Sequence, residues 1–277
     1  MKKIFLSMAL AISMMASAQV FEVGQLTKLN TPTDTDVKVA GVSPDGSYVL
    51  ITSGSNQGLR RYDVATGKTT TITTAAGAGY NVQISKDGQE LVYRETNFDA
   101  QGLRRSDIVR LDLTTAKTAT VAKGQRDMMA MASTGANLSV SINDRKIVLQ
   151  KNGKNIVLAP NGSNESYIWP SVSPDGTKLC YYVCGNGCWV SNIDGSNKQY
   201  IGHDCRAAQW YDNNTLVAMA DEDDGHFTTA SVVVAYTLDG KKQVLTNSSM
   251  IAMYPYVAEN LIVFSTLEGE TYMLNVK

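Results

Sequence analysis

Residues that commonly carry catalysis are scarce in this sequence. Only two histidines are present, His203 and His226, and no His-Glu-x-x-His pattern occurs, which excludes the helix-borne zinc site of that motif. No Gly-x-Ser-x-Gly segment occurs either, so the nucleophile elbow of α/β-hydrolases is absent. Gly67-Lys68-Thr69 ends like a phosphate-binding loop, but Tyr62 stands where the first glycine is required. We therefore assign no catalytic residue and predict no cofactor.

Charge is also sparse, and neither sign dominates. Asp, Glu, Lys and Arg make up 18% of the chain, and the formal net charge is −1. Nucleic-acid-binding domains carry a basic footprint that contacts phosphates, and nothing here resembles one. We therefore expect no nucleic-acid partner. Amphipathic helical periodicity is lacking beyond the N-terminal leader, which favours an all-β fold.

The N-terminus has the pattern of a secretory signal peptide. Lys2 and Lys3 precede an apolar run from Ile4 to Met15, and Ala16-Ser17-Ala18 is a small-residue cleavage signature. We predict a signal peptide over residues 1–18 and a single domain over residues 19–277, exported to the periplasm or the extracellular space. No later apolar run approaches the ~18 residues of a membrane span, so we do not expect the chain to cross a membrane.

Four cysteines lie close together in the sequence: Cys180, Cys184, Cys188 and Cys205. In an oxidising compartment an even cluster of this kind indicates disulfides. Cys184 and Cys188 flank a short loop and could bridge its two ends, which would leave Cys180 to pair with Cys205. The spacing of Cys184 and Cys188 fits a structural zinc site only loosely, and we predict no metal.

A repeated turn organises the chain. Ser43-Pro44-Asp45-Gly46, Ser85-Lys86-Asp87-Gly88 and Ser173-Pro174-Asp175-Gly176 are each followed by an alternating apolar run. Asp and Gly at these positions are typical of tight turns between strands, so we assign the aspartates to the turns rather than to a site. Weaker copies follow Trp210 and Val257, and Ser133-Thr134-Gly135 is expected to supply the most degenerate one. The mean spacing of about 43 residues falls within the ~40–45 of a four-stranded propeller blade.

The repeat predicts six blades of four antiparallel strands, and therefore a six-bladed β-propeller. The last unit stops after Thr271–Asn275 without a fourth strand. The segment Phe21–Leu29 reads as a strand with no blade of its own. Its pairing with the last blade would close the ring and remove exposed sheet edges.

These motifs resemble the propeller repeat of TolB-like proteins, seen here in Ser43–Gly46, Ser173–Gly176, Asp239-Gly240 and Leu245-Thr246. The resemblance covers about residues 21 to 277 and is specific for the fold. The family includes protein-interaction modules and propellers attached to hydrolases. Since the repeat accounts for nearly all residues after the leader, we expect no counterpart here of the additional N-terminal α/β domain of TolB.

Candidate binding residues lie near the starts of the innermost strands, which blade topology gathers around one mouth of the central channel. Aromatic and charged side chains converging on a cleft suit ligand binding, although aromatic residues there also suit packing between blades. We predict contacts at six residues: Tyr167, Trp169, His203, Asp204, Arg206 and Tyr256.

Two long loops, Thr96–Ser106 and Asp221–Thr229, are expected to form a rim on the same face. The second contains the acidic run Asp221–Asp224 followed by Gly225 and His226. Its spacing fails the calcium-loop pattern, so a solvated loop is favoured over a cation site.

Two classes of function remain open. The first is a non-catalytic binding module, most simply a monomer, that recognises an envelope protein, a peptide or a small ligand. The second is a carbohydrate-active or other hydrolytic or lyase enzyme acting on a saccharide in the channel mouth. Paired carboxylates in a deep pocket would indicate glycosidic chemistry, whereas a face without them would indicate binding.

Overall fold

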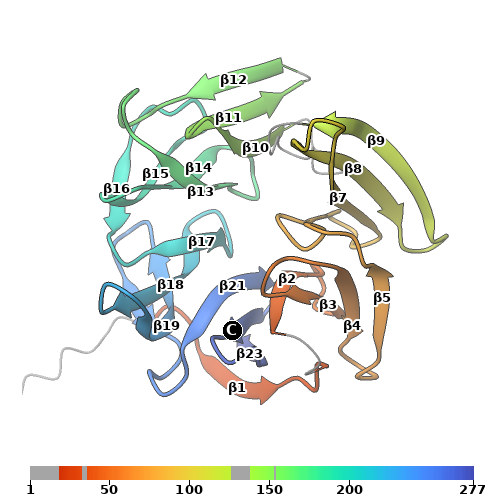
Figure 1. Ribbon diagram of the computed structural model, residues 1–277. Helices are drawn as coiled ribbons and strands as arrows, with labels where there is room; N and C mark the ends of the chain where they lie inside the picture. The colour runs from red at the N-terminus through yellow and green to blue at the C-terminus, as the bar shows by residue number, and fades with distance from the viewer. Residues whose placement is uncertain (1–18, 33–35, 126–137, 153) are drawn as a thin grey trace, which may run out of the picture.

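The computed structural model describes residues 19–32, 36–125, 138–152 and 154–277. The described chain folds into antiparallel sheets arranged around a central axis as a six-bladed β-propeller, as the repeat predicted (Figure 1). Within the described residues, no helix is long and apolar enough to cross a membrane.

Each blade runs outward from the axis in chain order. Blade 1 comprises β2 (Val37–Val42), β3 (Tyr48–Ser53), β4 (Leu59–Asp63) and β5 (Thr69–Thr73). Blade 2 comprises β6 (Gln83–Ile84), β7 (Glu90–Phe98), β8 (Arg104–Asp112) and β9 (Lys117–Gln125). Blade 4 comprises β13 (Tyr167–Val172), β14 (Lys178–Val183), β15 (Gly187–Asn192) and β16 (Gln199–Gly202). Blade 5 comprises β17 (Arg206–Trp210), β18 (Thr215–Asp223), β19 (Thr228–Thr237) and β20 (Lys242–Val244).

Three strands of blade 3 lie within the described residues: β10 (Leu138–Asn143), β11 (Lys146–Lys151) and β12 (Lys154–Leu158). Leu138 at the start of β10 approaches the Gly176 turn of the next blade, just as Leu261 approaches the Gly46 turn. Because Leu261 begins the second strand of its blade, β10 to β12 correspond to the second, third and outermost strands. The turn predicted at Ser133–Gly135 lies outside the described residues.

The N-terminal strand closes the ring. Blade 6 comprises β21 (Ala252–Ala258), β22 (Leu261–Thr266) and β23 (Thr271–Val276), and its fourth strand is β1 (Val23–Lys28), which pairs antiparallel with β23. Phe21 is buried beside Tyr211 of blade 5, with ring centroids 4.6 Å apart. Gln243 of blade 5 accepts hydrogen bonds from the Val20 and Phe21 amides and donates one to the Phe21 carbonyl. The predicted closure is confirmed.

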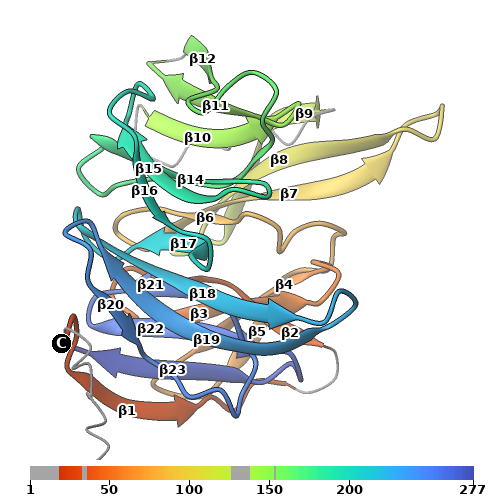
Figure 2. The ribbon, with the colours of Figure 1, turned by 90° about the vertical axis from the view of Figure 1, so that its left-hand side faces the viewer.

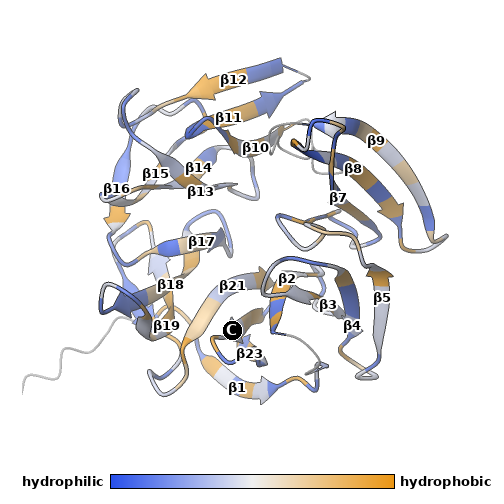
Figure 3. Cartoon of the chain, in the orientation of Figure 1, coloured by the Kyte–Doolittle hydropathy of each residue, from blue (hydrophilic) through white to orange (hydrophobic). Residues whose placement is uncertain are grey.

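The core lies between neighbouring blades rather than in one central mass. The second strands of blades 1, 4 and 6 are almost wholly buried, and β22 is buried along its whole length. One apolar cluster joins Tyr182 of blade 4 to Trp210 and Leu216 of blade 5, and comparable clusters lie between blades 5 and 6, 6 and 1, 1 and 2, and 3 and 4. Figure 3 shows the matching alternation of apolar and polar residues along the strands. Burial of apolar surface between neighbouring blades stabilises the ring.

The repeated Asp-Gly turns stabilise the connections between first and second strands. Gly46, Gly88 and Gly176 all adopt positive φ near 70°, which glycine reaches without steric cost. The Asp175 carboxylate accepts hydrogen bonds from the Ser173 hydroxyl, at 2.6 Å, and from the Thr177 amide, at 3.0 Å. The aspartates therefore complete the turns, as the sequence indicated.

We predict that closure by the N-terminal segment contributes strongly to stability. Phe21→Ala should lower the free energy of unfolding by about 3 kcal/mol, because it opens a cavity at the junction of blades 5 and 6. Val23→Ala, in the same segment but 42% exposed, should change it by less than about 0.5 kcal/mol. Urea denaturation measures both variants, and equal effects would contradict the closure.

We predict that the carboxylates of the Asp-Gly turns make the folding stability of the protein decrease at acid pH. The Ser173 hydroxyl and the Thr177 amide lower the pKa of Asp175 from 3.8 to about 2. Because the folded-state pKa is depressed, this stabilisation is present above pH 3.8 and is lost as the pH falls towards 2. Asp175→Asn keeps an acceptor in the turn but cannot titrate. Its melting temperature should therefore fall less steeply than the wild-type value across this range, and parallel curves would refute the assignment.

Candidate functional site

A kink recurs in the innermost strands around the axis. The ladders between first and second strands shift register at Val39/Gly41 in blade 1, Ile168/Ser171 in blade 4, Arg206/Gln209 in blade 5 and Met253/Tyr256 in blade 6. Such bulges bend a strand and redirect the side chains at the kink, and they are common beside functional sites.

The backbone at these kinks is strained in the same way in several blades. Trp169, Ala207 and Tyr254 have φ of 50°, 49° and 50°, and Asn81 in blade 2 has φ of 55°. Asn81 and Trp169 each lie four residues before the serine that opens the turn of their blade. A bulky residue in the left-handed region is an outlier that the surrounding structure must hold in place. The left-handed backbone recurs at the kinks of several blades and is therefore a regular feature of the inner strands.

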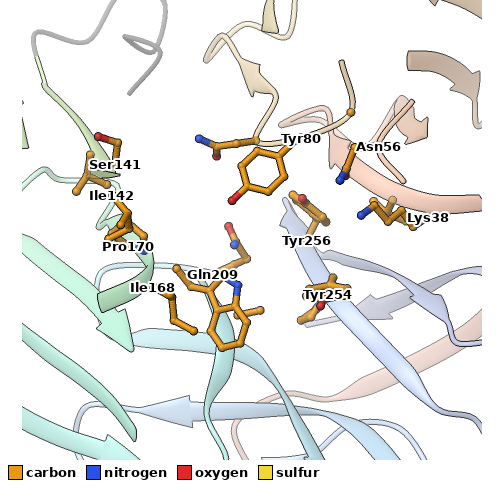
Figure 4. A pocket seen from close by; sticks show the side chains of 17 residues that line it. Lys38, Asn56, Tyr80, Ser141, Ile142, Ile168, Pro170, Gln209, Tyr254 and Tyr256 are labelled. Atoms are coloured by element: carbon orange, nitrogen blue, oxygen red, sulfur yellow. The ribbon is translucent and has the colours of Figure 1, made fainter. Parts of the chain in front are cut away.

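The kinked strands surround a cavity of about 640 Å³ on the channel axis. The four residues named above, Asn81, Trp169, Ala207 and Tyr254, all line it, as does Asn56, whose φ is 62°. Figure 4 shows side chains of different blades converging on this space. The remaining lining residues are Lys38, Val39, Asn56, Gly79, Tyr80, Val140, Ser141, Ile142, Ile168, Pro170, Gln209, Pro255 and Tyr256.

Aromatic rings form much of the cavity wall. Trp169 packs edge to face against Tyr182, with ring centroids 5.5 Å apart. Tyr80 lies 4.6 Å from the Arg94 guanidinium, which is oriented over its ring. Burial raises the pKa of Tyr256 to about 12, so its hydroxyl stays protonated at neutral pH and can donate a hydrogen bond. These rings offer apolar faces together with phenolic donors.

The polar groups of the cavity are mostly neutral. Asn56, Asn81 and Gln209 present side-chain amides. Among the described residues that line the cavity, Lys38 carries the only formal charge at neutral pH. The described lining contains no Asp, Glu, His or Cys, and no cluster of three such residues suited to a metal occurs in the described parts of the chain.

Two of the six predicted binding residues, Trp169 and Tyr256, line the cavity. Arg206 lies just behind the wall, with its guanidinium 5.6 Å from the Trp169 ring. It is held there by the Asp221 carboxylate, 2.7 Å away. Burial raises the pKa of Asp221 although the Arg206 charge opposes this. Arg206 is therefore placed to support Trp169 rather than to face the cavity.

The structure places the other three predicted residues away from the cavity wall. Tyr167 is buried in blade 4 against Tyr181, and its hydroxyl donates to the Gly162 carbonyl. Tyr167 lies before the bulge of β13, whereas Trp169, two residues further on, lies within it. His203 and Asp204 are exposed on the loop before β17, with side chains 67% and 58% accessible.

The two long loops are mostly ordered as extended hairpins. β7–β8 and β18–β19 project on the same side of the molecule (Figure 2). In the acidic run, Asp221 pairs with Arg206, and Asp224 accepts hydrogen bonds from the His226 and Phe227 amides. These carboxylates are therefore engaged within the chain, consistent with a solvated hairpin tip.

The four cysteines are free thiols, and neither predicted bridge is formed in this structure. Cys184 lies in an exposed turn, whereas Cys188 points into the core, so the two face different environments. The Cys180 sulfur lies 3.6 Å from that of Cys188, its neighbour across the hairpin, rather than pairing with Cys205. Spacing along the chain did not reveal which side of the strand each thiol occupies.

Sequence reasoning missed several lining residues, above all Lys38, Asn56 and Tyr254. One signal was available, because Trp169-Pro170 and Tyr254-Pro255 occupy matching positions before their turns. Lys38 and Asn56 carry no comparable signal, since an isolated polar residue in a strand or loop is common.

Comparison with known proteins shows the fold alone. No protein-family model and no curated protein matches the sequence. Among solved structures, a putative TolB from Agrobacterium tumefaciens is 17% identical, with a TM-score of 0.60 over 91% of this chain and 96% of that chain. An oligogalacturonate lyase in complex with manganese is 15% identical, with a TM-score of 0.52 over 85% of this chain and 76% of that one. Pyrococcus horikoshii acylaminoacyl peptidase is 14% identical, with a TM-score of 0.51 over 81% of this chain and 40% of that one.

We predict that the kinks of the inner ring carry backbone strain. Ala207 and Ala208 are neighbours and both are buried, but only Ala207 has positive φ. Ala207→Gly should therefore destabilise the protein less than Ala208→Gly by about 1 kcal/mol, since glycine avoids the left-handed penalty. Thermal or urea denaturation of the two variants gives the comparison. Equal losses would show that the Ala207 backbone is unstrained.

Proposed function

We propose that this protein is an exported, non-catalytic protein-interaction module that takes a segment of a partner protein into the mouth of its central channel. The composition of the cavity carries this proposal. Aromatic faces, side-chain amides and one lysine converge from several blades, the usual mix of a recognition site. The likeness to a putative TolB supports a TolB-like propeller, and the signal-peptide pattern of residues 1–18 supports export.

The two projecting hairpins extend the contact surface beyond the cavity. Phe98 and Leu103 on the β7–β8 hairpin are 71% and 46% exposed, and Phe227 on the β18–β19 hairpin is 75% exposed. The cavity opens on the same side, because Lys38, Trp169 and Tyr254 all lie near the starts of their strands. Large exposed apolar side chains on a shared face fit a protein surface better than a small solute.

An enzyme acting on a saccharide is the second candidate function. The resemblance to an oligogalacturonate lyase and the aromatic walls favour it. Glycoside hydrolysis commonly uses two carboxylates about 5–10 Å apart across the bond that is cleaved. The described residues that line the cavity supply no carboxylate, so binding is the better-supported function.

The proposal is tested by peptide selection with two matched tryptophan variants. A phage-displayed library of random peptides is panned on the mature chain, and enriched peptides are resynthesised. Trp169→Ala removes a ring of the cavity wall, and Trp189→Ala removes a ring that packs on Tyr200 away from the cavity. We expect Trp169→Ala to weaken peptide binding at least tenfold, about 1.4 kcal/mol, while Trp189→Ala leaves it within about twofold.

Calorimetric titration gives the affinities, and melting curves confirm that both variants are folded. If no peptide is enriched on the wild-type chain, peptide recognition is rejected. Equal losses in the two variants would place the binding surface elsewhere.

A further inference from the structure

Lys38 occupies an unusual position among the lysines of this protein. It lies in β2, opposite Thr52, and its side chain reaches the cavity wall beside Asn56 (Figure 4). The side chain is half-buried, and this burial lowers the pKa of the ammonium group. Desolvation of a charge is unfavourable unless a partner compensates it.

Other partly covered lysines have such a partner. Lys146 donates to the Glu165 carbonyl at 2.7 Å, and Lys178 donates to the Asn213 carbonyl at 3.2 Å. Within the described residues, Lys38 forms neither an ion pair nor a hydrogen bond through its side chain, and it is the only charged group of the described cavity wall. Among the described residues, the site thus holds a partly desolvated cation and no compensating anion.

We infer that the segment bound in the channel presents a carboxylate to Lys38, so that the partner of this module is recognised through an acidic residue next to apolar ones. This inference rests on the proposed function and specifies its ligand. An ammonium–carboxylate hydrogen bond is stronger than a neutral one, and the partial burial reduces its screening. The Asn56 amide also lines the cavity and is a donor that could serve the second carboxylate oxygen.

The aromatic walls determine what flanks the acidic residue. Tyr254 and Tyr256 lie on the same side of the cavity as Lys38 (Figure 4), and Trp169 also lines the cavity. Their faces suit an apolar or aromatic side chain on either side of the carboxylate. A uronic acid also carries a carboxylate, but it would leave the apolar hairpin tips at Phe98 and Phe227 without a contact. The observations therefore favour an acidic peptide segment.

The test uses three lysine variants and the random peptide library. Lys38→Met keeps the length of the side chain and removes its charge, and Lys38→Glu reverses the charge. Lys86→Glu makes the same change of net charge in an exposed Asp-Gly turn at the opposite end of the channel. Each variant and the wild-type chain are panned separately, after melting curves show that they are folded.

We expect peptides enriched on the wild-type chain and on Lys86→Glu to share an aspartate or glutamate beside apolar residues. Lys38→Met should bind a resynthesised acidic peptide on the order of tenfold more weakly, as should the wild-type chain with the amide form of that peptide. Lys38→Glu should enrich peptides with lysine or arginine instead. Raising the salt concentration should weaken binding to the wild-type chain more than to Lys38→Met.

Other results would overturn either the role of Lys38 or the proposed function, and the two cases can be distinguished. Enriched peptides without acidic residues, or acidic peptides that bind Lys38→Met as tightly as the wild-type chain, would reject the role of Lys38 and leave the binding module intact. No enrichment on the wild-type chain would reject the proposed function itself. Digalacturonate serves as the saccharide probe in the same titrations. If no peptide is enriched but digalacturonate binds the wild-type chain and not Lys38→Met, the ligand of Lys38 is an acidic saccharide rather than an acidic peptide.

Discussion

The pairing of β1 with β23 is the contact on which the geometry of this protein depends. Without it the propeller would be an open arc of blades whose last sheet ends in an unpaired strand. Gln243 and the buried Phe21 secure the segment from the side of blade 5, so the closure involves two blades rather than one. A closed ring holds the first strands at fixed positions around the axis. Residues that are distant in the sequence can then face one cavity.

Closure of the ring sets the positions of the inner strands, and the bulges set the orientation of the side chains that line the cavity. A regular strand places alternate side chains on opposite faces, and Trp169 or Tyr254 would follow that alternation without the kink. The left-handed backbone at these residues redirects them to the axis, at a cost that burial between the blades must offset. Such a site is formed before any ligand arrives, which reduces the ordering needed for binding. The Arg206 guanidinium packs on the Trp169 ring and helps to hold this side chain in place.

The cavity and the hairpin tips, the two parts of the proposed binding face, differ in their charge. The cavity is aromatic and mostly neutral, with Lys38 as its one described charge, whereas the hairpin tips carry exposed phenylalanines beside charged residues. Three of the four thiols take no part in this face, since Cys180, Cys188 and Cys205 are buried between blades 4 and 5. In the function proposed above, recognition is concentrated where the inner ring and the projecting hairpins meet.

The sequence by itself determined the fold of this protein. The Asp-Gly turns recur at regular intervals, and the unpaired strand at Phe21–Leu29 required a partner, because turn chemistry and edge pairing are local properties that residue type reveals. The face of the channel on which Trp169 and Tyr256 lie followed from the same topology. Only the tertiary structure decided which side chains reach the cavity. Tyr167 faces the core and Lys38 reaches the cavity, because these positions depend on how the neighbouring blades pack around each strand, which no local pattern encodes.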